Sequence, residues 1–214
     1  LDRLTRHLNG EENVALPILT SCCPAWVNFF EHYFPEMRDI PSTARSPQQM
    51  FGSIAKTYFA DMIETKREDL VVVSIMPCLA KKYECQRDEF SVDGNPDVDY
   101  SISTRELAAL IKQANIDFDS LEDSDFDQPM GESSGAGVIF GTTGGVIEAA
   151  SRTAYELFTK KKHERISFEE LRGFDGIRQA TLDFDGLPIK IGIKHGLGNA
   201  RKLLLKSCLV QVVV

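Results

Sequence analysis

The sequence has 214 residues, of which 43% are hydrophobic and 26% are charged, and its formal net charge is -8. This length and composition are typical of a globular protein with one well-buried core or two small lobes. No apolar run reaches the roughly 18 residues that a membrane span requires, and the excess of acid argues against nucleic acid as a partner. We therefore expect a soluble protein that binds neither membranes nor nucleic acid.

Strand-like apolar runs alternate with helical patterns along the chain. The runs that predict strands are 15–20, 70–76, 137–140 and 189–194, and the helices predicted after them are 25–34, 79–87, 146–159 and 199–206. Two further helices are expected at 47–66, after the start signal Ser46-Pro47, and at 104–114, with Thr104 as an incomplete cap. Repeated strand–turn–helix units indicate an α/β fold with mixed, largely parallel sheets flanked by helices.

Acidic residues are concentrated in the segment 117–132, DFDSLEDSDFDQPMGE. A charge-rich stretch without hydrophobic periodicity is typical of a solvated loop. We therefore interpret this segment as a surface connection.

The five cysteines are an odd number for a chain of this size. They are Cys22, Cys23, Cys78, Cys85 and Cys208. An odd count that includes two adjacent residues argues against a disulfide framework. Metal binding or thiol chemistry in a reducing compartment is the better interpretation.

The Cys22-Cys23 pair and Cys78 share one predicted setting, since each follows an apolar strand and stands at the start of a helix beside a proline. The partial positive charge at a helix N-terminus stabilises a thiolate, and Lys81, on the same helix face as Cys78, adds a cation. Thiolates are the ligands of soft metals and iron-sulfur clusters. Cys85 and Cys208 have no such setting, so we expect them to behave as small hydrophobic residues.

Other site types fit the sequence less well. A structural zinc site uses four ligands, commonly in close pairs, and the histidines show no ligand spacing; they are His7, His32, His163 and His195. No particular histidine is singled out as the base of a cysteine nucleophile. The glycine-rich turns at 141–145 and 196–201 lack the full phosphate-loop and dinucleotide signatures.

The cysteine motifs resemble those of a known family. TSCCPAW at 20–26 and MPCLAKKYE at 76–84 resemble, in the right order, the first two signature motifs of the iron-only hydrogenases. The segments at 42–50, 135–156 and 195–204 also resemble that family. The resemblance implies a two-lobed hydrogenase-like fold, incomplete at both ends, with a partial catalytic domain at 1–206 and an atypical tail at 207–214.

In the resembling family, the cofactor is a four-iron four-sulfur cluster bridged to a two-iron centre that carries CO, cyanide and a dithiolate. By this resemblance, Cys23 and Cys78 are cluster ligands, Cys22 is a proton-relay thiol, and Lys81 pairs with a cyanide. Pro47, Gln48, Met76 and Phe140 correspond to the pocket lining around the two-iron centre, and Ser42 to a hydroxyl of the proton path. Glu84 is either a helix-face acid paired with Lys81 or a residue that supports the site.

The family's third motif, which contributes two more cysteines, is absent after HGLGNARKLL. With half of the expected thiolates, this chain is expected to hold the cluster poorly and to be inactive as it stands. Cys208 lies too early in the sequence to replace them.

The resemblance implies an enzyme that reversibly reduces protons to H2 with electrons from ferredoxin. The alternative is a non-catalytic relative of cytosolic iron-sulfur cluster assembly, and such relatives generally have one cysteine where this chain has Cys22-Cys23. The segment around 141–159 resembles the short algal enzymes of chloroplasts, which makes the chloroplast the expected compartment if the protein is algal.

Overall fold

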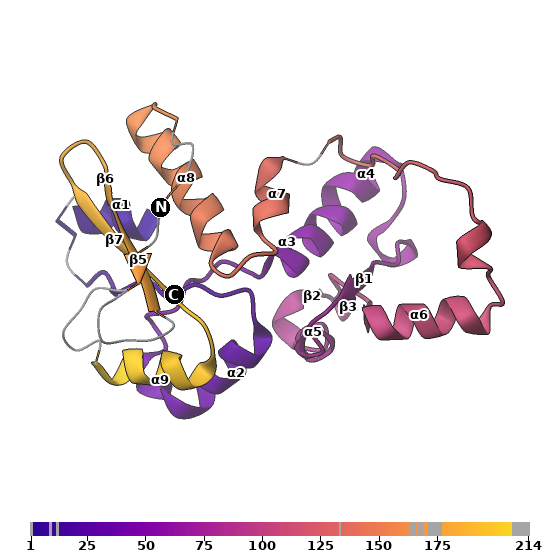
Figure 1. The fold of residues 1–214 in the computed structure, drawn as a ribbon, viewed down its shortest axis with the longest axis horizontal. Coiled ribbons are helices and arrows are strands. Elements are labelled where there is room, and N and C mark those ends of the chain that lie inside the picture. The colour runs from indigo at the N-terminus through magenta and orange to yellow at the C-terminus, as the bar shows by residue number, and fades with distance from the viewer. Residues whose placement is uncertain are drawn as a thin grey trace. The chain divides into compact units, whose positions relative to one another are not determined.

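The computed structural model describes residues 2–8, 10–11, 13–132, 134–162, 166, 169–170 and 177–206. The chain divides into two compact units, which confirms the predicted two lobes (Figure 1). Unit 1 consists of Leu1–Ser21, Phe29–Ala44 and Ser133–Val214, and unit 2 of Cys22–Asn28 and Arg45–Glu132. The predicted tail at 207–214, with Cys208, and His163 lie outside the described residues.

Unit 1 contains an antiparallel sheet in the order β5-β6-β7, made of β5 (Glu169–Glu170), β6 (Ile177–Asp183) and β7 (Pro188–Lys194). β6 and β7 are joined as a hairpin. Asp185 and Gly186, at the centre of its turn, have φ angles of 52° and 94°. A type I′ turn requires left-handed conformations at both positions, and Asp-Gly is a preferred pair for it.

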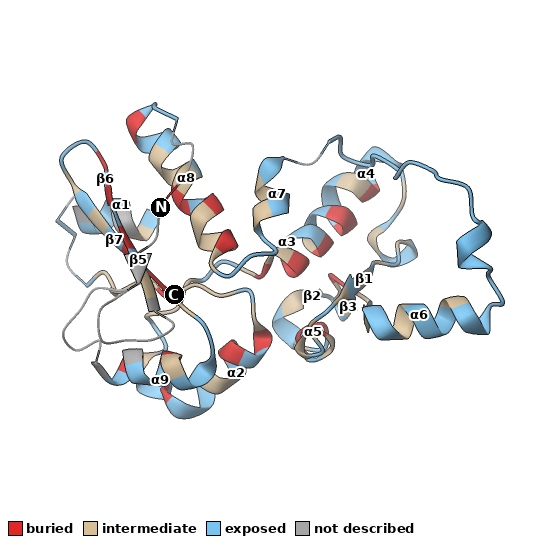
Figure 2. Ribbon diagram, in the orientation of Figure 1, coloured by how far each residue is buried: buried red, intermediate tan, exposed pale blue. Residues whose placement is uncertain are grey.

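The core of unit 1 lies where α8 (Gly145–Thr159) packs on one face of this sheet. Side chains alternate between the two faces of a strand, so every second residue of β6 and β7 points to the helix. The buried cluster comprises Ile166, Ala180, Leu182, Phe184 and Ile191. Tyr155 of α8 meets the Phe184 ring edge-on at a centroid distance of 5.3 Å. Ile147, Ala154 and Tyr155 of α8 pack against this cluster and are themselves partly buried, whereas exposed positions of the helix lie between them (Figure 2).

A glycine turn leads from α7 (Gly135–Ile139) into α8. Gly144 has a φ angle of 82°, and a Cβ there would lie 2.3 Å from Ile193 Cδ1. A Cβ on Gly145 would lie 1.6 Å from the carbonyl oxygen of Ile139. The predicted strand at 137–140 is wrong, because this segment makes helical hydrogen bonds, such as Phe140 N to Ala136 O at 3.2 Å.

The remaining elements of unit 1 are α1 (Asp2–Leu8), η1 (Pro35–Met37) and α9 (Leu197–Lys206). Arg3 donates to the carbonyls of Ile40 and Pro41 at 2.8 and 3.1 Å. The predicted strand at 15–20 is wrong. Its backbone forms only an isolated bridge between Leu19 and Pro41, with no continuing ladder in the described residues.

Unit 2 contains a parallel pair, β1 (Val73–Met76) with β4 (Tyr100–Ser103). Each strand is followed by a helix, α5 (Ala80–Glu84) after β1 and α6 (Thr104–Gln113) after β4. Unit 2 also contains a small antiparallel pair and three short turns: β2 (Ser91–Val92), β3 (Asn95–Pro96), η3 (Arg67–Asp69), η4 (Asp88–Phe90) and η5 (Phe118–Ser120). α2 (Pro24–Tyr33) begins in unit 2 and ends in unit 1.

The predicted helix at 47–66 is confirmed as one continuous helical segment that ends at residue 62. It runs through α3 (Pro47–Ile54), the π-helical turn η2 (Ala55–Phe59) and α4 (Ala60–Met62). Ser46 caps it, since its Oγ accepts a hydrogen bond from Gln49 N at 3.4 Å. The buried residues of this segment recur on one side of it (Figure 2).

α6 starts with a complete capping box, not with the incomplete cap predicted at Thr104. Ser103 is the N-cap: its Oγ accepts from Glu106 N at 3.2 Å, while the Glu106 carboxylate accepts from Ser103 N at 2.7 Å. Hydrogen bonds from the Lys82 ammonium and from Ser103 lower the pKa of Glu106 to about 2. The prediction missed the cap by one residue, because Ser103 also belongs to the preceding strand.

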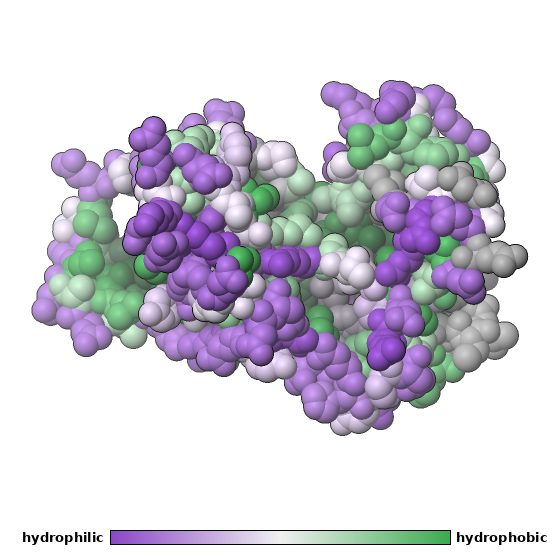
Figure 3. Space-filling model, turned by 180° about the vertical axis from the view of Figure 1, so that it is seen from behind, coloured by the Kyte–Doolittle hydropathy of each residue, from purple (hydrophilic) through white to green (hydrophobic). Residues whose placement is uncertain are grey.

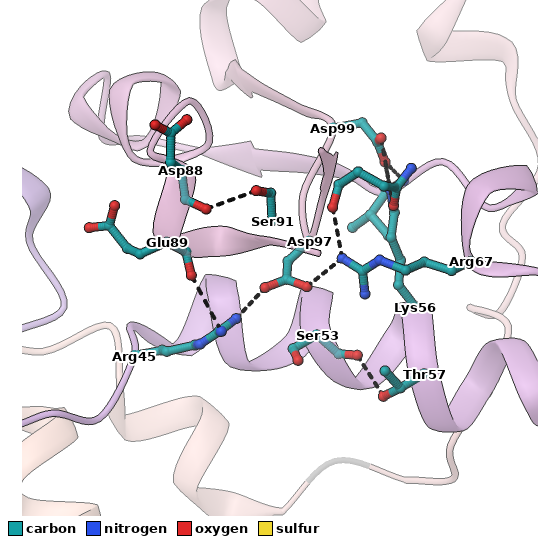
Figure 4. A network of polar contacts seen from close by, with 12 residues as sticks. Arg45, Ser53, Lys56, Thr57, Arg67, Asp88, Glu89, Ser91, Asp97 and Asp99 are labelled. Atoms are coloured by element: carbon teal, nitrogen blue, oxygen red, sulfur yellow. Dashed lines mark hydrogen bonds and ion pairs between the residues drawn. The ribbon is translucent and has the colours of Figure 1, made fainter. Parts of the chain in front are cut away.

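A charged network, which we call the framework network, joins the long helix to residues 95–99 in unit 2 (Figure 4). Asp97 is fully buried and pairs with the guanidinium groups of both Arg45 and Arg67, the latter at 2.7 Å. Lys56, only 2% exposed, donates to Asp99 at 2.8 Å and to Asn95 Oδ1 at 3.2 Å. Buried charges need such partners to offset the loss of hydration.

The helix approaches the framework network closely at Gly52. A Cβ on this residue would lie 2.6 Å from both the Asp97 carbonyl oxygen and Val98 Cγ2. Glycine is therefore the residue that lets backbone pack against backbone here.

The acidic segment 117–132 is exposed along its whole length, as expected for a surface connection. Apolar side chains are exposed within it as well, and Phe126 is 97% accessible. Figure 3 shows one face of the molecule, on which apolar surface interrupts the polar surface.

The α/β class with mixed sheets is confirmed, and so are the strands at 70–76 and 189–194. The share of parallel pairing is smaller than expected: among the described strands, only β1 and β4 pair in parallel. The reason is β6, an unpredicted strand that joins β7 through a hairpin, so this sheet has no helical crossover.

Candidate functional site

The cysteines that the sequence singles out lie in unit 2, around the starts of two helices. Cys22 and Cys23 directly precede α2, which begins at Pro24, and the Cys23 carbonyl accepts a hydrogen bond from Val27 N at 3.2 Å. Cys78 lies in the turn between β1 and α5. Cys22 is exposed, whereas Cys23 and Cys78 are half-buried, and none of the three is in a disulfide. The strand–turn–helix setting is confirmed for Cys78, but no strand precedes Cys22 in the described residues 13–21.

Lys81 connects the two cysteine segments. Its ammonium donates to the Cys22 carbonyl at 2.6 Å, and its backbone N–H donates to the Cys78 carbonyl at 3.2 Å. Lys81 is only 6% exposed. A buried cation therefore lies beside both segments that the sequence assigns to metal chemistry.

Glu84 is the counter-ion of Lys81. The Lys81 ammonium is 3.0 Å from Glu84 Oε2 and 3.2 Å from Oε1. The carboxylate also accepts hydrogen bonds from Ser46 Oγ at 2.9 Å and Gln48 Nε2 at 3.2 Å, and Glu84 is only 5% exposed. The i, i+3 pairing with Lys81 is confirmed, and burial distinguishes it from an ordinary surface pair.

Gln48 extends this group of contacts, which we call the cysteine-side network, toward the parallel pair of strands. Its Oε1 accepts from Ser74 Oγ at 2.8 Å, and its Nε2 also contacts Cys85 Sγ at 3.2 Å. Burial is the main cause that raises the pKa of the Cys85 thiol, with a smaller contribution from the Glu84 charge. The expectation that Cys85 is a small buried residue is confirmed.

The other predicted site residues are divided between the two units. Pro47, the first residue of α3, and Met76, the last residue of β1, are half-buried in unit 2. Ser42 and Phe140 belong to unit 1. The Ser42 hydroxyl accepts from Ala44 N at 3.2 Å, and Phe140 is 39% exposed at the end of α7.

Sequence reasoning missed Ser46 and Ser74 as members of the cysteine-side network. Ser46 was recognised only as a helix start, and its contact with Glu84 spans 38 positions of the chain. Ser74 lies between apolar residues in β1, on the more buried face of the strand. A polar residue on that face could have indicated a buried hydrogen bond.

The donor set fits an iron-sulfur group in kind. Cys23 and Cys78 offer sulfur ligands, which such clusters require, and Lys81 supplies a positive charge for an anionic ligand. The structure brings together no group of three or more His, Cys, Asp or Glu residues able to hold a metal ion, as far as the described residues extend. In the described residues these two cysteines therefore do not form a closed zinc site, which takes four ligands.

In the described part of the chain, no helix has the length and apolar character needed to cross a membrane.

A family model described as "Iron only hydrogenase large subunit, C-terminal domain" matches residues 2–208. The NADP-reducing hydrogenase subunit HndD of Solidesulfovibrio fructosivorans is 64% identical over 208 residues, covering 97% of this chain and 35% of that protein. The periplasmic Fe hydrogenase large subunit of Nitratidesulfovibrio vulgaris is 46% identical, over 92% of this chain and 46% of that protein.

Solved structures agree with these matches. A variant of the FeFe-hydrogenase HydA1 from Chlamydomonas reinhardtii superposes with a TM-score of 0.83 at 37% identity, covering 100% of this chain and 62% of that chain. The chain thus spans between one third and two thirds of the length of these proteins.

A second group of relatives is similar at lower identity. A probable cytosolic Fe-S cluster assembly factor of Nematostella vectensis is 32% identical over 95% of this chain and 47% of that protein. The two groups correspond to the two functional interpretations of the sequence.

Proposed function

This chain belongs to the family defined by the C-terminal domain of the iron-only hydrogenase large subunit, and we propose that the protein carrying it reversibly reduces protons to H2. The electron donor is ferredoxin, and the cofactor is a four-iron four-sulfur cluster bridged to a two-iron centre with CO, cyanide and dithiolate ligands. The observation that supports this most is the pair Cys22-Cys23, in which one thiol is exposed and its neighbour is half-buried.

Cys23 and Cys78 are the cluster ligands that this chain supplies. When bound, the cofactor supplies the electrons and the site at which protons and H2 are interconverted. The two thiolates fix its position from two segments that Lys81 holds together through the carbonyls of Cys22 and Cys78.

Cys22 carries the proton in this proposal. A thiol both donates and accepts a proton at Sγ, and general acid–base catalysis by a positioned group contributes about 100-fold or more to a rate. The Cys22 side chain is exposed while its carbonyl is held by Lys81, so the backbone is fixed and the thiol can reach solvent. Ser42 is the hydroxyl proposed for the further proton path.

The remaining proposed site residues hold and enclose the cofactor. The Lys81 ammonium holds an anionic ligand. In this proposal Pro47, Gln48 and Met76 of unit 2 exclude water, which strengthens electrostatic interactions inside the site. Phe140, in unit 1, stays a pocket-lining residue by the family resemblance alone.

The test replaces Cys22 by Ser in the protein isolated anaerobically with its cofactor. We expect unchanged iron content and a loss of H2 evolution of about 100-fold or more. Cys23→Ala and Cys78→Ala should instead lose iron, whereas Cys85→Ala, the matched control, should retain it. Full turnover in Cys22→Ser would exclude the relay role, and iron loss confined to Cys85→Ala would overturn the ligand assignment.

Non-catalytic iron-sulfur cluster assembly is the alternative function. The identities of 64% and 46% to named hydrogenases, against 32% to the assembly factor, favour the hydrogenase. An iron-loaded protein that neither produces nor consumes H2 with any electron donor would support the alternative.

The electron donor and the compartment need separate tests. One relative is named as NADP-reducing, so H2 evolution should be compared with reduced ferredoxin and with NADPH, and activity with NADPH alone would exclude ferredoxin. The identity to the Solidesulfovibrio protein, 64%, exceeds the 37% to the Chlamydomonas enzyme. A chloroplast location therefore has no support from these comparisons.

A further inference from the structure

We propose that Glu84 is a positioning residue, which fixes the Lys81 ammonium at the cysteine segments through its own anchors on α3. This inference rests on the proposed function, because it concerns how the proposed cofactor pocket is held. Glu84 itself need not touch the cofactor.

The starting point is the flexibility of lysine. Its ammonium is a compact charge on a four-carbon stem with several rotatable bonds, so a defined position requires fixed acceptors. Lys81 has two: the Cys22 carbonyl at 2.6 Å and the Glu84 carboxylate at 3.0 and 3.2 Å. The carbonyl gives a contact to the cysteine segment, and the carboxylate gives the opposite charge.

The Glu84 carboxylate is in turn held by hydrogen bonds from two further side chains. Ser46 Oγ and Gln48 Nε2 both donate to Oε2, at 2.9 and 3.2 Å. Both donors lie at the start of α3, where Ser46 is also the N-cap. Oε2 therefore accepts from two neutral donors and from the Lys81 ammonium, which also contacts Oε1.

Because these side chains are buried, other positions of the Lys81 and Glu84 side chains are unfavourable. Ser46, Gln48, Lys81 and Glu84 are each no more than 7% exposed. A buried carboxylate or ammonium that leaves its partners meets no water to replace them. We infer that the start of α3, through Glu84, determines where the Lys81 charge lies relative to Cys22.

The test uses the whole chain without cofactor, by nuclear magnetic resonance of lysine side-chain ammonium groups. Buried, hydrogen-bonded ammonium protons exchange slowly with water, so Lys81 and Lys56 should give signals that exposed lysines do not. Lys81→Met and Lys56→Met assign the two signals.

Glu84→Gln preserves the shape of the side chain and removes its charge. We expect proton exchange at Lys81 to accelerate about tenfold or more, the change that corresponds to a lost charged hydrogen bond, while the Lys56 signal persists. Asp99→Asn is the matched control and should affect Lys56 alone, because Asp99 is the carboxylate partner of that lysine. Unchanged exchange at Lys81 in Glu84→Gln, with Lys56 intact, would overturn the proposal.

Loss of both signals in Glu84→Gln would mean that unit 2 has unfolded, and Ser46→Ala then decides. This variant removes one anchor of Glu84 and keeps the carboxylate. Faster exchange at Lys81 but not at Lys56 supports the proposal, and unchanged exchange at both overturns it. Since no cofactor is present, the result is independent of the H2 assay that tests the proposed function.

Discussion

Two buried lysines of unit 2, Lys56 and Lys81, each form an ion pair with a carboxylate, but they connect different segments of the chain. In the framework network, Lys56 of η2 pairs with Asp99, and the nearby Asp97 pairs with Arg45 and Arg67. In the cysteine-side network, Lys81 pairs with Glu84, and the contacts continue to the Cys22 carbonyl. The first network joins a helix to residues 95–99, whereas the second reaches the segments proposed to bind metal.

The contrast shows that burial of charge alone does not identify a functional site. Both lysines are at least 94% buried and each has a carboxylate partner. Lys81 differs from Lys56 because it also donates to the backbone carbonyl of Cys22, and the side chain of Cys22 is exposed. We therefore expect mutations in the framework network to change mainly the free energy of unfolding. Mutations in the cysteine-side network should change mainly the chemistry of the proposed site.

The largest stability effect is expected for Asp97→Ala. This change leaves two guanidinium groups without their shared carboxylate, and removing one partner of a buried ion pair costs about 3–5 kcal/mol. The free energy of unfolding, measured by urea denaturation, should fall by that amount. Asp61→Asn, at an exposed position of α4, is the control and should change it by less than about 0.5 kcal/mol. Equal effects of the two variants would refute the framework role.

Gly52→Ala tests the packing beneath the framework network. The new Cβ would meet Asp97 O and Val98 Cγ2 at 2.6 Å, and overpacking of this kind costs about 1–3 kcal/mol. The same change at Gly137 of α7, where a Cβ would meet no atom within 4 Å, should stabilise by about 0.5–1 kcal/mol, because alanine favours helix. Thermal unfolding should show a lower melting temperature for Gly52→Ala and a higher one for Gly137→Ala. A stabilised Gly52→Ala variant would contradict the close approach of the helix to residues 97 and 98.

The capping box of α6 contains a carboxylate, Glu106, that is paired with a lysine like those of the buried networks but is exposed to solvent. Ser103→Ala should cost about 1 kcal/mol of stability. The pKa of Glu106 is lowered to about 2 from 4.5, so its stabilising contribution is complete above pH 4.5 and is lost as pH falls toward 2. The difference in unfolding free energy between wild type and Glu106→Gln should stay constant above pH 4.5 and shrink as pH falls from 4.5 toward 2. A difference that does not change between pH 4.5 and 2 would exclude this contribution.

The smallest effect is expected at alkaline pH from Cys85, the buried thiol of the cysteine-side network. Its pKa is raised in the folded state from 9.0, so the folded protein keeps the proton that the unfolded chain releases. Its contribution to stability is complete below pH 9 and is lost as pH rises through the folded-state pKa. Between pH 8 and 10, wild type should lose slightly more stability than Cys85→Ala in urea denaturation. An identical loss would indicate an unperturbed thiol.

The sequence predicted the elements with long, regular patterns and failed at two of the short ones, 15–20 and 137–140. The predicted helix at 146–159 repeats its apolar residues over about four turns and the one at 199–206 over about two, and both are confirmed. The four residues of 137–140 suit a strand or a helix equally by periodicity. Gly145 at the start of α8 closely approaches the carbonyl of Ile139 at the end of α7, and hydrophobic periodicity does not encode this contact.

The site shows the same division. The cysteines and Lys81 were found because motif spacing is local, and their metal and relay roles remain predictions. Glu84 could be placed opposite Lys81, three residues away, but its contacts with Ser46 and Gln48 join positions 38 and 36 residues apart. Pairings across such separations depend on how β1, α3 and α5 pack, which hydrophobic periodicity does not encode.

The contact between Lys81 and residue 22 has an evolutionary consequence. Its acceptor is the backbone carbonyl, which every amino acid possesses. Substitution at position 22 can therefore change or remove the thiol while the scaffold around Cys23 and Cys78 persists. Under the proposed function, one substitution at position 22 removes the proposed proton relay and leaves the two proposed cluster ligands in place.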